Sequence, residues 1–303
     1  MNIDPTASPN PAFGRGVFIG LTASAATMSS IGQAIADDQS FGKPHPPIVA
    51  ENDPDITVER PELPVGTATV DAYAAMPRVN DKRTPGIVMV QHVWGVDAQI
   101  RDTVRRLAKA GYVTVAPDLY AGMGAPSGDG VSDYTVFAPF ASKLDPNEVD
   151  AEIESGATWI RSRVGSGPTE RPPKVGIMGF CMGGKIALRA AIDDKGIFDA
   201  AVIFYGGVRW DDSKNQGPIS DAALAWTQGV TIPLMGQYGA RDTSILPADV
   251  QAMQARLKVP NDIKIYPEAG HAFFDDTRER YVASAAADAW TRTLTWFGKY
   301  LSY

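Results

Sequence analysis

The chain has 303 residues, of which 44% are hydrophobic and 21% charged, and its formal net charge at pH 7 is −7. This composition is typical of a globular protein with a sizeable core, and the acidic balance argues against a nucleic-acid-binding surface. His45, His92, His271 and the single Cys181 show none of the paired spacings of metal sites, so we expect no metal. No apolar run approaches the ~18 residues that a membrane span needs.

The N-terminal segment differs in composition from the rest of the chain. Arg15 precedes an apolar stretch from Val17 to Ala26, and a second, weakly apolar stretch ends in small residues at Ala36. A basic residue, a short apolar core and a small-residue end predict that residues 1–36 are an export signal of a periplasmic or secreted bacterial protein. The alternative is a disordered N-terminal segment on a cytoplasmic enzyme.

The remainder of the chain predicts one α/β domain. Residues 37–60 are rich in Asp and Pro and predict a linker or surface strap, which leaves residues 61–303 as a single catalytic domain. Alternation at Ile56–Glu59 and Thr67–Tyr73 predicts an opening hairpin. From residue 86 onward, strands at 86–92, 112–117, 175–178, 200–205, 230–236 and 263–266 alternate with helices at 100–110, 149–164, 185–192, 247–257 and 280–300. Such alternation predicts a mainly parallel central sheet with helices on both faces.

One turn in this pattern carries a nucleophile signature. Gly179–Gly183 reads G-x-C-x-G between an apolar strand and a helix, which is the nucleophile elbow of hydrolases with sulfur in place of oxygen. The helix that follows places its N-terminus near the sulfur and favours the thiolate. Because Cys181 is the only cysteine, it cannot form an internal disulfide.

An acid and a histidine follow in the order that the elbow requires. Asp242 comes after the next-but-one strand, and His271 after the last strand. Carboxyl ends of parallel strands meet at one edge of a sheet, so the three side chains should converge there. Singly, each has a plainer interpretation: an inert buried thiol, a turn aspartate and a loop histidine. Together they predict a triad in which the histidine takes the thiol proton and the aspartate fixes its tautomer.

The chain resembles the dienelactone hydrolase family, the carboxymethylenebutenolidases, over about residues 62–300. The matching segments are Val90–Gly95, Ile100–Asp102, Leu107–Tyr112, Ala116–Tyr120, Gly179–Gly184, Phe204–Gly206, Asp242 and Ala269–His271. The resemblance implies an α/β-hydrolase fold without a large cap domain, and a cofactor-free hydrolase whose substrate is a small-molecule ester or lactone. It implies Cys181, Asp242 and His271 as the triad, and the backbone N–H groups of Val93 and Met182 as the oxyanion hole.

Two positions depart from the family. His92 stands where a glutamate usually helps to activate the thiol, and is either a pocket donor or second proton acceptor near sulfur, or a satisfied histidine at a strand end. Asp275 stands where an arginine binds the substrate carboxylate, and should repel such a group. A neutral or aromatic ester is therefore at least as good a candidate substrate. Trp94, Tyr120, Tyr205 and Phe273 are candidates to line an aromatic pocket, with core packing as the alternative.

The predicted reaction is covalent acyl transfer through a thioester acyl-enzyme. Alternatives within the enzymes are a broader carboxylesterase that acts on neutral or aryl esters, and a cysteine peptidase on a similar elbow. The alternative from another class is a non-catalytic binding protein with this fold. The sequence is compatible with both a monomer and a homodimer.

Overall fold

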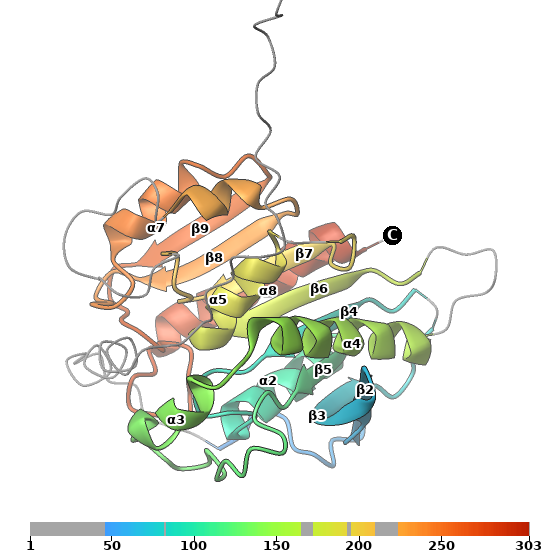
Figure 1. Ribbon diagram of the computed structural model, residues 1–303. Helices are drawn as coiled ribbons and strands as arrows, with labels where there is room; N and C mark the ends of the chain where they lie inside the picture. The colour runs from blue at the N-terminus through green and yellow to red at the C-terminus, as the bar shows by residue number, and fades with distance from the viewer. Residues whose placement is uncertain (1–45, 82, 165–171, 193–194, 210–223, 303) are drawn as a thin grey trace, which may run out of the picture.

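A computed structural model describes residues 46–81, 83–164, 172–192, 195–209 and 224–302 of the chain (Figure 1). The predicted export signal, residues 1–36, lies outside these ranges. Among the described residues, no helix is both long and apolar enough to cross a membrane.

The centre of the molecule is a nine-stranded sheet of order β1-β3-β5-β4-β6-β7-β8-β9, with β2 paired to β3 (Figure 1). Strands β4 to β9 run parallel to one another, and the antiparallel pairs are those of β3 with β1, β2 and β5, at one end of the sheet. The strands are β1 (Ile56–Glu59), β2 (Glu62–Val65), β3 (Ala68–Pro77), β4 (Gly86–Val90), β5 (Val113–Pro117), β6 (Val175–Phe180), β7 (Ala200–Phe204), β8 (Leu234–Gly239) and β9 (Asn261–Tyr266). This is the α/β-hydrolase arrangement that the sequence predicted.

The antiparallel end of the sheet differs from the predicted hairpin. The hairpin partner of β3 is β2, which the sequence analysis missed, and the chain turns between them at Gly66 with φ +60°. Pro61 and Pro64 made this segment look like a turn in the sequence. An edge strand such as β2 nevertheless tolerates proline. Strand β1 pairs with the other half of the ten-residue β3. The sheet therefore starts at Ile56, where a strand was predicted, within the range 37–60 that was also assigned to a linker or surface strap.

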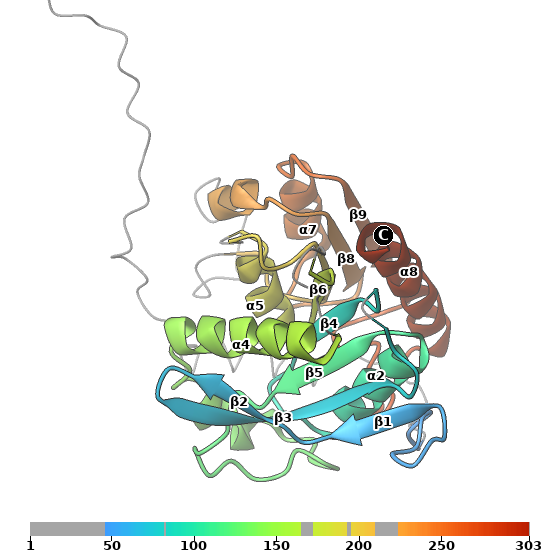
Figure 2. The same cartoon turned by 90° about the vertical axis from the view of Figure 1, so that its right-hand side faces the viewer.

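Helices cover both faces of the sheet (Figure 2). One face packs against α4 (Pro146–Val164), α5 (Met182–Ala190) and α7 (Pro247–Gln254). The other packs against α2 (Ala98–Lys109) and α8 (Ala283–Leu301). The two apolar layers that result hold the strands in one rigid frame.

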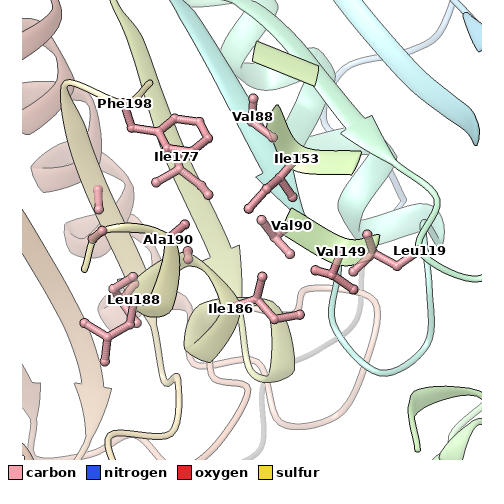
Figure 3. Packing of buried hydrophobic residues seen from close by; sticks show 14 of the residues in the cluster. Val88, Val90, Leu119, Val149, Ile153, Ile177, Ile186, Leu188, Ala190 and Phe198 are labelled. Carbon is pink, nitrogen blue, oxygen red and sulfur yellow. The ribbon is translucent and has the colours of Figure 1, made fainter. Parts of the chain in front are cut away.

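The core beneath α4 and α5 fixes the elbow helix against the sheet. Figure 3 shows Ile153 of α4 beside Val88 and Val90 of β4, with Ile186 of α5 close by. All four side chains are at most 3% exposed. Burial of each contributes roughly 1.5–3 kcal/mol, so the start of α5 and the end of β4 are held in a fixed relation.

Residues 134–144 contain two short helices and form no large cap. They are a 3₁₀ turn, η1 (Tyr134–Val136), and α3 (Ala138–Ala141). Phe137 between them is fully buried, and the Phe140 ring lies 6.0 Å from the Tyr120 ring. A further 3₁₀ turn, η2 (Trp226–Gly229), precedes β8.

Candidate active site

The turn between β6 and α5 holds Cys181 in an unusual backbone conformation. Cys181 has φ +52° and ψ −113°, and α5 begins at the next residue. A Cβ at Gly179 would lie 2.1 Å from the carbonyl oxygen of Gly183, and a Cβ at Gly183 would lie 2.4 Å from the carbonyl oxygens of Val90 and Gln91. Side chains at either position would collide with backbone, so the two glycines are what allows so sharp a turn. The turn lifts the sulfur above the end of the sheet.

The structure brings Cys181, His271 and Asp242 into one line. His271 Nε2 lies 3.1 Å from the sulfur of Cys181, and His271 Nδ1 lies 2.7 Å from Oδ2 of Asp242. The other carboxylate oxygen of Asp242 accepts the N–H groups of Ser244 and Ile245 at 2.8 and 2.9 Å. The three side chains come from the ends of β6, β8 and β9, and all are buried. The base is therefore within hydrogen-bond reach of the sulfur, and its ring is oriented by a fixed carboxylate.

Charge around the imidazole favours its protonated form. Burial by itself lowers the pKa of His271, but the negative charges of Asp242 and Cys181 outweigh burial and raise that pKa to about 10. A proton on His271 is stabilised when the neighbouring sulfur is negative, so the geometry suits a thiolate–imidazolium pair.

This raised pKa predicts the titration of the histidine ring. In protein labelled with ¹⁵N-histidine, NMR should show His271 still protonated at pH 8 and losing its proton only near pH 10, the value to which its pKa is raised. An ordinary histidine titrates near pH 6.5. In Cys181→Ala, loss of the sulfur charge should shift the midpoint downward. A wild-type midpoint near pH 6.5 would contradict the ion pair.

The two predicted oxyanion residues lie at neighbouring strand ends. Met182 is the first residue of α5, and Val93 follows β4, the parallel neighbour of β6. The hydroxyl of Tyr120 lies 3.8 Å from the Met182 sulfur and donates to the Val93 carbonyl at 3.0 Å. One buried side chain thus touches both residues.

Both ring nitrogens of His92 face groups other than the Cys181 sulfur. Nδ1 accepts the N–H of Trp94 at 3.2 Å, and Nε2 lies 3.2 Å from Oδ1 of Asp97 as an ion contact rather than an aligned hydrogen bond. The acceptor role of Nδ1 places the proton of a neutral ring on Nε2. The contacts of both nitrogens are thus with a backbone N–H and a carboxylate, and not with the Cys181 sulfur.

Arg278, which the sequence analysis missed, joins Asp97, the neighbour of His92, to the loop after His271. Its guanidinium donates to Asp97 at 2.9 Å and to Asp275 at 2.5 Å, and lies 4.1 Å above the Trp94 ring. Asp275 is therefore bound to an arginine of its own loop. The only signal in the sequence was the spacing of Asp275 and Arg278, which did not reveal the contact with residues almost two hundred positions earlier.

The four candidate aromatic residues occupy different environments. Tyr205, at the end of β7 with φ +38°, has its ring 5.2 Å from that of His271. Burial raises the pKa of Tyr205, and the charges of Asp275 and Cys181 add to this. Phe273 is fully buried and packs on Tyr205 and Tyr266, so it lies in the core. Trp94 and Tyr120 are also buried, beneath Arg278 and beside the predicted oxyanion residues respectively.

The described part of the chain holds no group of three or more His, Cys, Asp or Glu side chains arranged to bind a metal ion.

Comparisons with known proteins give a consistent family match. A model of the dienelactone hydrolase family matches residues 70–301. A protein of Escherichia coli (strain K12) named "Putative carboxymethylenebutenolidase" is 36% identical over 256 residues, which are 84% of this chain and 91% of the relative. A "Probable 2-oxo-3-(5-oxofuran-2-ylidene)propanoate lactonase" of Bradyrhizobium is 28% identical over 227 residues, 74% of this chain and 86% of the relative.

Solved structures agree with the sequence relatives. A crystal structure titled as a putative dienelactone hydrolase from Klebsiella pneumoniae subsp. pneumoniae is 32% identical, with a TM-score of 0.67 over 81% of this chain and 99% of that one. A dienelactone hydrolase of Anabaena variabilis, at 18% identity and a TM-score of 0.58, shares the fold.

Proposed function

The chain belongs to the dienelactone hydrolase family and is a carboxylic ester hydrolase, and we propose that it acts through a Cys181–His271–Asp242 triad and a thioester acyl-enzyme. The observation that carries this proposal is the buried line of contacts from the Cys181 sulfur through both nitrogens of His271 to Asp242. Neither a non-catalytic binding function nor an inert buried thiol accounts for these contacts or for the strained turn at Cys181.

Acylation follows from the placement of these groups. The Cys181 thiolate attacks the ester carbonyl carbon, and the N–H groups of Val93 and Met182 donate to the oxyanion that forms. The carbon–oxygen bond to the alcohol then breaks, and the His271 imidazolium gives its proton to the leaving oxygen. The products of this half-reaction are a free alcohol, a thioester on Cys181 and a neutral His271.

Deacylation returns the enzyme to its starting state. His271 takes a proton from water, and the hydroxide attacks the thioester carbonyl. The carbon–sulfur bond breaks, the thiolate leaves beside the imidazolium, and the acid is released. Because a thiolate leaves more readily than an alkoxide, the acylation intermediate reverts unless the alcohol is a good leaving group. Aryl esters, enol esters and strained lactones should therefore react best, and amides poorly.

Charge near the triad bears on the substrate class. His92, Asp97, Asp275 and Arg278 form a buried cluster in which two carboxylates face one guanidinium. This guanidinium is already bound by both carboxylates, so the cluster has no spare cation for a substrate carboxylate. Burying such a group beside Asp275 without a new partner is costly. We propose neutral esters, aryl esters among them, as the preferred substrates.

Matched esters test both the activity and this preference. The p-nitrophenyl ester of monomethyl succinate should be hydrolysed with a kcat/KM at least about tenfold above that of p-nitrophenyl succinate. The two esters differ in charge only by the free carboxylate of the second. About 1.4 kcal/mol of unfavourable free energy from this carboxylate is enough for a tenfold difference. A higher kcat/KM for the charged ester would contradict the preference. Failure to hydrolyse these esters, dienelactone and simple lactones alike would contradict the activity.

Export remains a proposal that rests on residues 1–36 alone. Cell fractionation of the full chain against a chain that starts at residue 37 tests it, and the full chain found only in the cytoplasm would contradict it.

A further inference from the structure

We propose that His92 and Tyr120 are positioning residues that orient the Val93 N–H as an oxyanion donor. The inference rests on the proposed function and deepens it, because it assigns a role to the histidine that replaces the family glutamate. In this role His92 acts on the oxyanion, through the backbone, and not on the sulfur.

The hydrogen bonds of the turn at residues 92–95 carry the argument. The His92 carbonyl accepts the N–H of Gly95 at 3.1 Å, and the His92 ring accepts the N–H of Trp94 at 3.2 Å. The Val93 carbonyl accepts the hydroxyl of Tyr120 at 3.0 Å. The peptide that joins Val93 to Trp94 is thus held at its oxygen by Tyr120 and at its nitrogen by His92. None of these bonds uses the N–H of Val93. The peptide groups on both sides of the Val93 Cα atom are held in place, and the Val93 N–H is left to donate to a substrate.

The two residues that hold the turn are themselves fixed from outside it. The His92 ring lies against Asp97, which caps α2 by accepting the Ile100 N–H at 3.2 Å and accepts from Arg278 at 2.9 Å. The Tyr120 backbone N–H donates to Asp118 at 3.0 Å. Both side chains are at most 4% exposed. Their orientation is therefore set by packing and hydrogen bonds before any substrate binds, as an effective oxyanion donor requires.

Tyr120 also connects the two proposed donors. Its hydroxyl lies 3.8 Å from the sulfur of Met182 while it donates to Val93. A Cβ at Gly183, the residue after Met182, would lie 2.4 Å from the carbonyl oxygens of Val90 and Gln91, so the start of α5 already touches the end of β4. This close approach of the two backbones sets the spacing of the Val93 and Met182 N–H groups, and the Tyr120 ring packs beside it.

Two reactions of the Cys181 sulfur distinguish a role of His92 in orienting the Val93 N–H from a role as the base that activates the sulfur. Ester hydrolysis builds an oxyanion, whereas alkylation by iodoacetamide displaces iodide from a saturated carbon and builds none. His92→Phe and Tyr120→Phe should each lower kcat for p-nitrophenyl acetate by about 10- to 100-fold, below the 10²–10³ for complete loss of one donor. KM should change little, and the rate of Cys181 alkylation should stay within about twofold of wild type.

Conservative and distant variants serve as controls. His92→Asn keeps an acceptor near the place of Nδ1 and should restore kcat to within about fivefold of wild type. Tyr112→Phe removes a hydroxyl at the opposite end of the strand that Tyr120 follows, and should leave kcat unchanged. Thermal unfolding of each variant shows whether it is folded. If His92→Phe does not fold, the inference is tested by the kcat of Tyr120→Phe, a variant that loses only one oxygen atom.

Each outcome distinguishes the inference from the proposed function. Slower alkylation in His92→Phe, in parallel with slower hydrolysis, would place His92 on the sulfur and overturn the inference. Hydrolysis by folded Tyr120→Phe at the rate of Tyr112→Phe would also overturn it. Absence of hydrolysis in the wild-type protein would instead contradict the proposed function.

Discussion

Replacing Cys181 by alanine is expected to lower kcat for p-nitrophenyl acetate by roughly 10⁵- to 10⁶-fold, the scale of losing a triad nucleophile. Under the proposed mechanism the substitution removes the atom that forms the covalent bond, and His271 and Asp242, which are engaged with each other, have no sulfur to activate. The fold should survive, because cysteine already occupies the positive-φ turn and alanine adds no larger side chain there.

Circular dichroism and thermal unfolding provide the control for Cys181→Ala, and His271 should keep its contact with Asp242 in this variant. A folded Cys181→Ala protein with turnover within about tenfold of wild type would exclude Cys181 as the nucleophile.

Replacing Asp242 by asparagine is expected to lower kcat by about 10⁴-fold while the protein stays folded. The retained oxygen can still accept from the N–H groups of Ser244 and Ile245. The new amide then faces Nδ1 of His271 as a donor, which forces the ring proton onto Nε2. A ring with its proton on Nε2 has no lone pair for the Cys181 proton, and the charge that stabilised the imidazolium is gone.

A matched control for Asp242→Asn is Asp262→Asn near the start of β9, at the opposite end of this strand from His271, where the carboxylate pairs with Arg292. This control should keep kcat within about twofold, since surface pairs contribute little. Equal activity of the two variants would show that the aspartate of the triad is dispensable.

Local patterns predicted the elbow and the strand ends well, for physical reasons. The glycines around Cys181 and the apolar run before it determine a strand, a turn and a helix within a few residues. Asp242 and His271 could be placed because parallel strands bring their carboxyl ends to one edge. These features depend on sequence neighbours and on one rule of topology.

Features that depend on distant pairing were not predictable in the same way. The strand predicted at residues 230–236 is β8 at Leu234–Gly239, because pairing with β9, and not the apolar run, decides where it lies. Strand β2 exists because the ten-residue β3 is long enough to pair with β1 along one half and with β2 along the other, in addition to its pairing with β5. The contact of Arg278 with Asp97 joins loops that lie 181 residues apart, and no local spacing encodes it.

This contact also changes the interpretation of the two family departures. Asp275 accepts a hydrogen bond from Arg278, and the His92 ring faces Asp97 and the backbone N–H of Trp94. Sequence comparison by position suggested a replaced base and a repelling acid. The structure instead places both residues in one buried cluster, in which two carboxylates bind the guanidinium of Arg278.

The most direct test of the account is to trap the acyl-enzyme. Wild-type protein mixed with p-nitrophenyl acetate and quenched in acid within the first turnovers should show one acetyl group by intact mass, mapped to the Cys181 peptide and removed by hydroxylamine as a thioester. The Cys181→Ala protein should show none. Hydrolysis by wild-type protein without any adduct, or an adduct of equal yield in Cys181→Ala, would contradict covalent catalysis by Cys181.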